Sequence, residues 1–231
     1  MIPESANATL FEKRCARVFR EMCDAPGVNV SEAEFGEIRS PFDDPAVIFR
    51  RLESSKSLPL GSEVQRNFFR FHEIKMYWRS SRPDSHMVGE FHLTHLYRSV
   101  AGNHVSNTRE GKTDRERELY DELRIFDDTP STGTGRLTAL RVVNGSSNPE
   151  IWFFDMRPRT LPMDLDYGAY LDTLLATKGT IGWQYLFCDV EFGDPGFTPV
   201  VKGLAEMLEV FPQLFPDYDY SDLKARFRER T

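Results

Sequence analysis

Two short histidine motifs in this chain could support proton transfer on a phosphate ester. His92-Leu93-Thr94 and His104-Val105-Ser106 both have the form His-x-Ser/Thr. In a paired arrangement, each histidine would move a proton and each hydroxyl group would hold a phosphate oxygen. This chemistry requires both histidines to reach a single phosphate. A phosphodiesterase that uses His92 and His104, with Thr94 and Ser106, is therefore one functional hypothesis.

The spacing of the histidines argues against that hypothesis and against a metal site. Two-histidine phosphoesterases carry their motifs on separate, symmetry-related strands, whereas here the motifs lie 104 − 92 = 12 residues apart, the second in a polar segment. A metal site built from His92, His95 and His104 is also disfavoured, because strand positions i and i+3 point to opposite faces of a sheet. We therefore expect histidines without catalytic function and no bound metal.

A glycine-containing segment, residues 127–136 (DDTPSTGTGR), has the composition of a phosphate-binding loop. Such loops leave a strand and open a helix, whereas this segment runs into a strand pattern at residues 137–143 and has no Gly-Lys-Ser/Thr ending. We predict a rigid turn held by Asp and Thr side chains. The sequence also contains no GxSxG elbow, HExxH helix or catalytic cysteine pattern, which predicts a protein that is not an enzyme and needs no cofactor.

The cysteines are few and odd in number. Cys15, Cys23 and Cys188 show no CxxC spacing, which argues against a disulfide framework and against a zinc site. We expect all three to behave as small buried hydrophobic residues.

The charge of the chain is uneven. The net charge is −7, but residues 150–222 alone hold 13 acidic and 4 basic side chains, a balance of 4 − 13 = −9. Such a surface repels phosphate backbones and attracts cationic proteins, so nucleic acid is excluded as a partner and a basic protein is favoured. The plainer alternative is a solvated acidic surface that keeps the protein soluble.

The chain has no apolar run near the roughly 20 residues that span a bilayer, and its first residues (MIPESAN) lack the basic start and apolar stretch of a signal peptide. These features predict a cytoplasmic protein without a membrane partner.

Apolar periodicity and capping residues predict both helices and strands. Helices are expected at 8–23, from Asp44 to Leu52, from Ser62 through Trp78, from Thr113 to Tyr120, at 167–178 and from Thr198 to Pro212. Strands are expected at 90–97, 137–143 and 150–155, the last two joined as a hairpin by residues 144–148. Residues 101–113 read as a loop, and residues 182–190 fit a helix or a strand. No internal repeat appears, so we predict a single α+β domain with a mostly antiparallel sheet flanked by helices.

Two stretches carry a family resemblance. The first is Leu58-Pro59, then Phe68, Trp78 and residues 89–93 (GEFHL); the second comprises residues 149–155 (PEIWFFD), Leu161-Pro162 and residues 164–189, which include GWQYLF. Their order resembles that of the SUKH superfamily domain. The resemblance implies a single SUKH-like domain over 1–231, with its core at about 58–190 and helical extensions at 1–57 and 191–231.

The resemblance also implies a function. Bacterial SUKH proteins are often immunity proteins encoded beside toxins, many of them nucleases, while other branches regulate cell-wall synthesis or bind the protein translocation channel. The expected activity is therefore non-enzymatic protein binding, most concretely the neutralisation of a basic toxin domain. A regulatory or scaffold protein of the cell-wall-synthesis type is the alternative.

Charge and aromatic content together predict which residues bind the partner. Asp164 and Asp166 precede the predicted helix 167–178, where the helix dipole favours acids, so both are expected to be exposed without a structural partner. Asp172 adds a third charge on the exposed side of that helix, and Trp183 is the aromatic residue expected to line a partner groove. Substituting the three aspartates by lysine should slow association with a basic partner.

Overall fold

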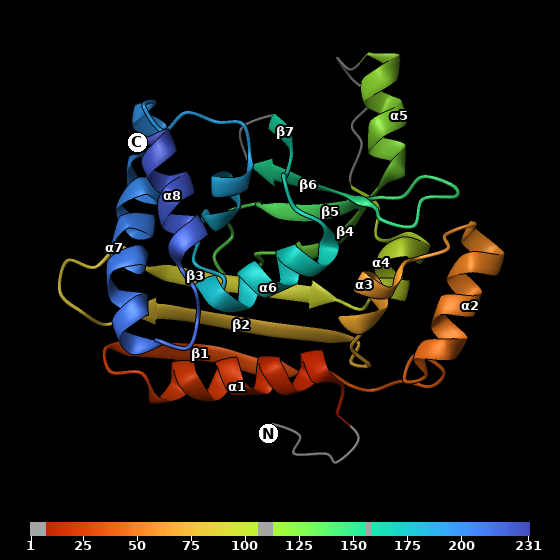
Figure 1. Cartoon of the computed structure of the whole chain (residues 1–231), viewed down its shortest axis with the longest axis horizontal. Helices are drawn as coiled ribbons and strands as arrows, with labels where there is room; N and C mark the ends of the chain where they lie inside the picture. Colours follow the sequence, from red (N-terminus) through yellow and green to blue (C-terminus); the bar gives the residue numbers. More distant parts are fainter. Residues whose placement is uncertain (1–7, 106–112, 156–158) are drawn as a thin grey trace.

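The fold is built on an antiparallel sheet in which every strand pairs with the next one along the chain (Figure 1). The computed structural model describes residues 8–105, 113–155 and 159–231. Within these residues the sheet has seven strands in the order β1-β2-β3-β4-β5-β6-β7. They are β1 (Val28–Phe35), β2 (Glu73–Ser80), β3 (Val88–Thr94), β4 (Leu123–Asp128), β5 (Leu137–Arg141), β6 (Glu150–Asp155) and β7 (Arg159–Pro162).

Helices cover one broad face of this sheet. In Figure 1, α6 crosses the middle of the sheet, α1 runs along the β1 edge, and α7 and α8 stand side by side at one end. The helices are α1 (Leu10–Asp24), α2 (Pro45–Lys56), α3 (Ser62–Arg66), α4 (Leu96–Gly102), α5 (Asp114–Glu122), α6 (Tyr167–Thr177), α7 (Thr198–Leu214) and α8 (Ser221–Arg230), with short 3-10 turns at Trp183–Phe187 and Pro195–Phe197. The expected α+β class is confirmed.

Strand alternation separates the two faces of the sheet. On β2, Ile74, Met76 and Trp78 are fully buried, and in the antiparallel register Ile74 lies opposite Leu93 while Met76 lies opposite Phe91. The intervening positions point to the other face, which is polar. The sheet therefore has an apolar face beneath α1 and α6. Its opposite face is charged along β2 and β3 and carries a smaller apolar cluster beneath α5, which includes Leu123, Ala139 and Phe154.

The centre of the core is a contact between a tryptophan and a glycine. Trp78 is fully buried, and its indole Nε1 donates a hydrogen bond of 2.7 Å to the carbonyl of Lys178, the residue that ends α6. Gly89 lies opposite Trp78 on β3, where a Cβ atom would lie 2.2 Å from that same Nε1. The glycine is required because only a residue without a side chain leaves room for the indole.

Several predicted elements are confirmed. Helix α1, α2 with Asp44 as its N-cap, α5 with a capping box between Thr113 and Glu116, and α6 closed by Lys178 all lie where the sequence predicts them. The β5–β6 hairpin also forms, with Leu137 opposite Phe154.

The helix predicted from Ser62 through Trp78 is wrong. Helix α3 ends at Arg66, and Glu73–Ser80 forms β2. Ile74 and Trp78 fit a helical period with Val64, but with Met76 they also fit the alternation of a strand. Pairing with β1 and β3 on both sides decides in favour of the strand.

The N-terminal extension, expected to be helical, contains the edge strand β1. Its alternation is hard to recognise because the register with β2 shifts between Val30 and Glu32, a β-bulge that changes which residues face the core. The strand expected at 90–97 ends at Thr94, since the His95 side chain accepts a hydrogen bond from the Tyr97 amide and caps α4. Part of the expected loop 101–113 lies outside the described residues.

The C-terminal part also differs from the prediction. Pro212 lies inside α7 rather than ending it, because Phe215 packs on Phe211 at a centroid distance of 5.2 Å and keeps the last turn in place. Residues Trp183–Phe187 form a 3-10 turn, so the ambiguous segment 182–190 is neither a regular helix nor a strand. Strands β4 and β7 were not predicted, and α8 was expected only as part of the helical extension 191–231.

Candidate functional site

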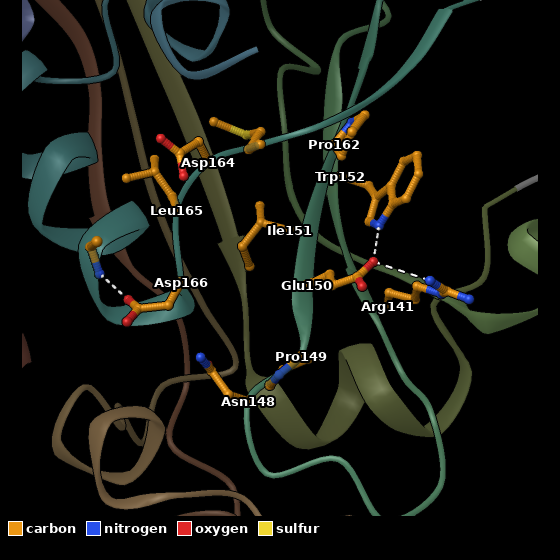
Figure 2. Close-up of a pocket in the computed structure, with 12 residues that line it drawn as sticks. Arg141, Asn148, Pro149, Glu150, Ile151, Trp152, Pro162, Asp164, Leu165 and Asp166 are labelled. Carbon is orange, nitrogen blue, oxygen red and sulfur yellow. Dashed lines mark hydrogen bonds and ion pairs between the residues drawn. The ribbon is translucent and has the colours of Figure 1, made fainter. Parts of the chain in front are cut away.

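A cleft of about 730 Å³ opens between strand β6 and the segment that leads into α6 (Figure 2). We call it the acidic cleft, because carboxylates stand on both of its sides. Figure 2 shows Glu150 and Trp152 on one side, Asp164 and Asp166 on the other, and Ile151 between them. Its lining residues are Arg141, Asn148, Pro149, Glu150, Ile151, Trp152, Pro162, Met163, Asp164, Leu165, Asp166 and Ala169.

The β6 side of the acidic cleft is fixed by a short hydrogen-bond network. Glu150 and Trp152 are two residues apart on a strand and therefore share a face. The Glu150 carboxylate accepts hydrogen bonds from Trp152 Nε1 at 3.0 Å and from Arg141 Nη1 at 3.1 Å, as the dashed lines in Figure 2 show. The bond from Trp152, followed by that from Arg141, lowers the pKa of Glu150. Glu150 is thus held as an anion, although 59% of its side chain is exposed.

The α6 side of the acidic cleft carries two aspartates with different constraints. Asp166 is the N-cap of α6, and its Oδ1 accepts a 2.7 Å hydrogen bond from the Ala169 amide. Asp164 lies with its Oδ2 3.2 Å from Arg226 of α8, and 83% of its side chain is exposed. Exposed ion pairs of this kind are worth about 0–1 kcal/mol, so the Asp164 carboxylate is open to competition from another cation.

The acidic surface continues around the next turn of α6. A second cleft of about 460 Å³ shares Leu165 and Ala169 with the acidic cleft. The acids that line it, which we call the acidic shoulder, are Asp172, Asp217, Asp219 and Asp222. Asp172 pairs with Arg14 of α1 at 2.7 Å and is 58% exposed. The two clefts together place acids along both sides of the first half of α6.

Three of the four predicted partner-binding residues lie on this surface, but the expectation that Asp164 and Asp166 lack structural partners is wrong. Asp164 pairs with Arg226, Asp172 pairs with Arg14, and Asp166 caps its helix. The charges are therefore partly used within the fold, as acids near cationic side chains and a helix N-terminus usually are.

Trp183, the fourth predicted residue, does not lie at the surface. Its side chain is fully buried, with its ring 4.9 Å from that of Tyr170 and 6.0 Å from that of Phe187. The preceding Gly182 has a φ of 88°, a left-handed conformation that turns the chain inward. The assignment of Trp183 to a partner groove is wrong for the folded protein. The aromatic residue of the acidic cleft is Trp152. The sequence signal for it was its position two residues after Glu150 in a predicted strand, which places both side chains on the same face.

The histidine motifs do not form one site. His92 lines a cleft of about 550 Å³ on the charged face of the sheet, the histidine cleft, whereas His104 pairs with Arg124 through an isolated β-bridge and is not among the residues that line it. His92 lies opposite Asp128 on β4, which places it roughly 10–13 Å along that strand from His104 at about 3.3 Å per residue. Ser106 lies outside the described residues.

His92 is also held in the wrong protonation state for a general base. Its Nδ1 lies 2.7 Å from Asp128 and its Nε2 lies 3.1 Å from Glu73. The bond to Asp128, with that to Glu73, raises the pKa of His92 to about 9 despite partial burial. An imidazolium that already donates from both nitrogens cannot accept a proton, which disfavours the phosphodiesterase hypothesis.

The segment 127–136 binds a carboxyl group of the protein itself. Glu90, 3% exposed, accepts backbone hydrogen bonds from Ser131 and from Thr132, the latter at 2.7 Å. The Thr129 and Thr134 hydroxyl groups lie 2.6 Å apart and tie the turn together. The threonine contacts of the predicted rigid turn are confirmed. The backbone amides of Ser131 and Thr132 already donate to the Glu90 carboxyl group of β3, so they are not available to a phosphate.

The cysteines are free thiols. Cys15 and Cys188 are buried, and burial raises the pKa of the Cys188 thiol to about 12. Cys23 is exposed, which contradicts the expectation that all three are buried. Over residues 8–105, 113–155 and 159–231, no group of three or more histidine, cysteine or acidic side chains is arranged to hold a metal ion.

Comparison with protein-family models, curated proteins and solved structures finds no significant match for this chain. The resemblance to the SUKH superfamily therefore stays a prediction. No helix in the described part of the chain combines the length and the apolar composition needed to cross a bilayer.

Proposed function

We propose that this chain is a non-enzymatic protein-binding domain, an immunity protein of the SUKH type that neutralises a basic toxin domain. The observation that carries the proposal is the acidic cleft, in which Glu150 on one side and Asp164 and Asp166 on the other flank a floor that includes Ile151 and Leu165. An apolar floor with anionic sides fits a protein segment that presents a basic side chain next to an apolar one.

The ion pairs of the acidic surface also support this proposal. Asp164 and Asp172 are each held by one arginine at the protein surface. A partner cation can replace either arginine without leaving a buried charge unpaired, because both carboxylates are more than half exposed. Such a surface is suited to fast electrostatic association followed by docking of apolar anchors.

The alternative within the same class is a regulatory or scaffold protein of cell-wall synthesis. It would use the same cleft for a different partner, so partner identity separates the two. The phosphodiesterase hypothesis has less support, since His92 is protonated and His104 does not line its cleft.

A co-expression experiment tests the proposal. A toxin-like domain encoded by a neighbouring gene would be induced in a host cell with and without the full chain, and survival would be counted. We expect the chain to restore survival and the two proteins to copurify. If the chain gives no protection, and affinity capture from the native cell yields only cell-wall or translocation proteins, the immunity function is excluded in favour of the regulatory one.

A further inference from the structure

The histidine cleft has the features of a ligand site, and the protein binding proposed for the acidic cleft does not involve it. It lies on the charged face of the sheet, where α4 packs beside β4, and it shares no lining residue with the acidic cleft. Its volume of about 550 Å³ is within the range of small-molecule sites. A ligand in this cleft would therefore contact none of the residues that line the acidic cleft.

The floor of the histidine cleft is anionic. Glu73 and Asp128 lie on either side of His92, and each contacts it through one carboxylate oxygen. The two carboxylates and one imidazolium leave a net charge of −1. The second oxygen of each carboxylate has no hydrogen bond within the described residues, so it is available to a cationic group of a ligand.

The α4 side of the cleft carries the opposite charge. Arg98 Nη1 donates to His72 Nδ1 at 2.9 Å. Burial, followed by the charges of Arg98 and Arg39, lowers the pKa of His72, which keeps that ring neutral. Among residues 8–105, 113–155 and 159–231, no carboxylate pairs with Arg98. Its guanidinium group is therefore a cation without a counterion at the edge of the cleft.

Aromatic and hydroxyl groups complete the wall between floor and edge. The rings of Tyr97 and Phe42 lie 5.3 Å apart and both line the cleft. The hydroxyl groups of Tyr97 and Thr94, which also lines the cleft, have no hydrogen-bond partner in the described part of the chain. A planar cation can pack on such a wall while it reaches the carboxylates below.

We propose that the histidine cleft binds a small zwitterion of amino-acid size whose side chain is a planar cation such as a guanidinium group, with this cation at Glu73 and Asp128 and the carboxylate at Arg98. The cleft presents both charges within one small volume, so a ligand that satisfies it carries both charges on one molecule of amino-acid size. A zwitterion with a planar cation matches the anionic floor, the aromatic wall and the cationic edge together.

Calorimetric titration of the full chain tests this proposal with three probes that differ in one group each. L-arginine carries a guanidinium group, an α-ammonium group and a carboxylate. L-citrulline keeps the ammonium group and the carboxylate but replaces the guanidinium group with a neutral one of the same shape, and agmatine keeps both cationic groups but lacks the carboxylate. We expect L-arginine to bind and the other two to bind at least about tenfold more weakly, since each loses one charge-assisted contact.

Matched variants assign the contacts. Arg98→Gln should weaken L-arginine about 10- to 100-fold and leave agmatine unchanged, whereas Asp128→Asn should weaken both. Glu73→Gln provides a second floor variant if Asp128→Asn fails to fold, as judged by circular dichroism. Lys13→Gln on α1 is the control and should bind like the wild type. The proposal is overturned if L-arginine gives no saturable binding to the wild type at about 1 mM, or if the Arg98 and floor variants bind it as tightly as the wild type does.

Discussion

The ammonium group of Lys178 lies 2.7 Å from the carboxylate of Glu21, although the lysine side chain is completely buried. It also lies 3.5 Å from the centre of the Tyr218 ring, and the Tyr218 hydroxyl donates to the same carboxylate at 2.9 Å. Burial lowers the pKa of Lys178 to about 8, against the opposing effect of Glu21. This pair joins the end of α6 to α1 and to the segment before α8, and thereby fixes the helix that borders the acidic cleft.

Replacing Lys178 with methionine should lower the free energy of unfolding by about 2–3 kcal/mol. Methionine keeps the apolar stem but leaves Glu21 without its buried partner, a loss that Arg17 at 2.7 Å compensates in part. Urea denaturation measures the effect, with Lys13→Met on the exposed side of α1 as the control. A variant as stable as the control would contradict a stabilising role for the pair.

The Tyr170 hydroxyl should contribute more to stability than a surface hydroxyl does. It lies 2.6 Å from buried Asp127 and 2.9 Å from Thr138. Burial raises the pKa of Asp127 to about 7, so this carboxyl depends on its hydrogen bonds. Tyr170→Phe should cost about 1–3 kcal/mol in urea denaturation. Tyr97→Phe is the matched control and should change stability by less than about 0.5 kcal/mol; equal losses in both variants would contradict the account of the core.

The stability of the protein should fall as pH rises through the titration of His92. The folded pKa of about 9 lies above the ordinary value of 6.5, so the stabilisation is complete below about pH 6.5 and is lost as pH rises through 9. Because His92 is partly exposed, we expect the free energy of unfolding to fall by only about 1–2 kcal/mol between these two pH values. The wild type should show a steeper pH dependence of unfolding over pH 6.5–9 than His92→Gln. Parallel curves would show that Asp128 and Glu73 do not hold the imidazolium.

Gly89→Ala should destabilise the protein by about 3 kcal/mol, because its Cβ atom would overlap the buried Trp78 indole. Gly102→Ala is the matched control, since nothing lies within 4 Å of its Cβ position, and it should stay within about 1 kcal/mol of the wild type. Thermal unfolding of both variants tests the packing. Similar melting temperatures for the two would contradict it.

The sequence predicted α1, α5 and the β5–β6 hairpin, because there the spacing of apolar residues and the capping or turn residues indicate the same element. These signals failed where two periods fit the same residues, as at Ile74 and Trp78, and where a bulge between Val30 and Glu32 changes the phase of β1. In both places, pairing with a distant strand decides the structure.

The candidate site was predictable in part. Asp164 and Asp166 could be placed before a helix, and Glu150 could be placed on a strand. Their position across one cleft depends on the return of the chain through β7, where Trp152 lies opposite Pro162. The burial of Trp183 likewise depends on packing under α6, which sequence composition does not reveal.

In the proposed function, the acidic cleft and acidic shoulder steer a basic protein partner. A variant that combines Asp164→Lys, Asp172→Lys and Asp166→Asn changes the charge of this surface by 2 + 2 + 1 = +5, while asparagine keeps the cap of α6. The control is Glu53→Lys, Glu118→Lys and Asp43→Asn, which changes the charge by the same +5 at exposed positions outside both clefts.

The most direct measurement is the association rate of the captured partner with both variants and the wild type across a salt series. The cleft variant should associate about 10- to 100-fold more slowly at low salt, with a flatter salt dependence, while the control retains most of the wild-type rate and slope. A cleft variant that associates at the wild-type rate with an unchanged salt slope would contradict the account.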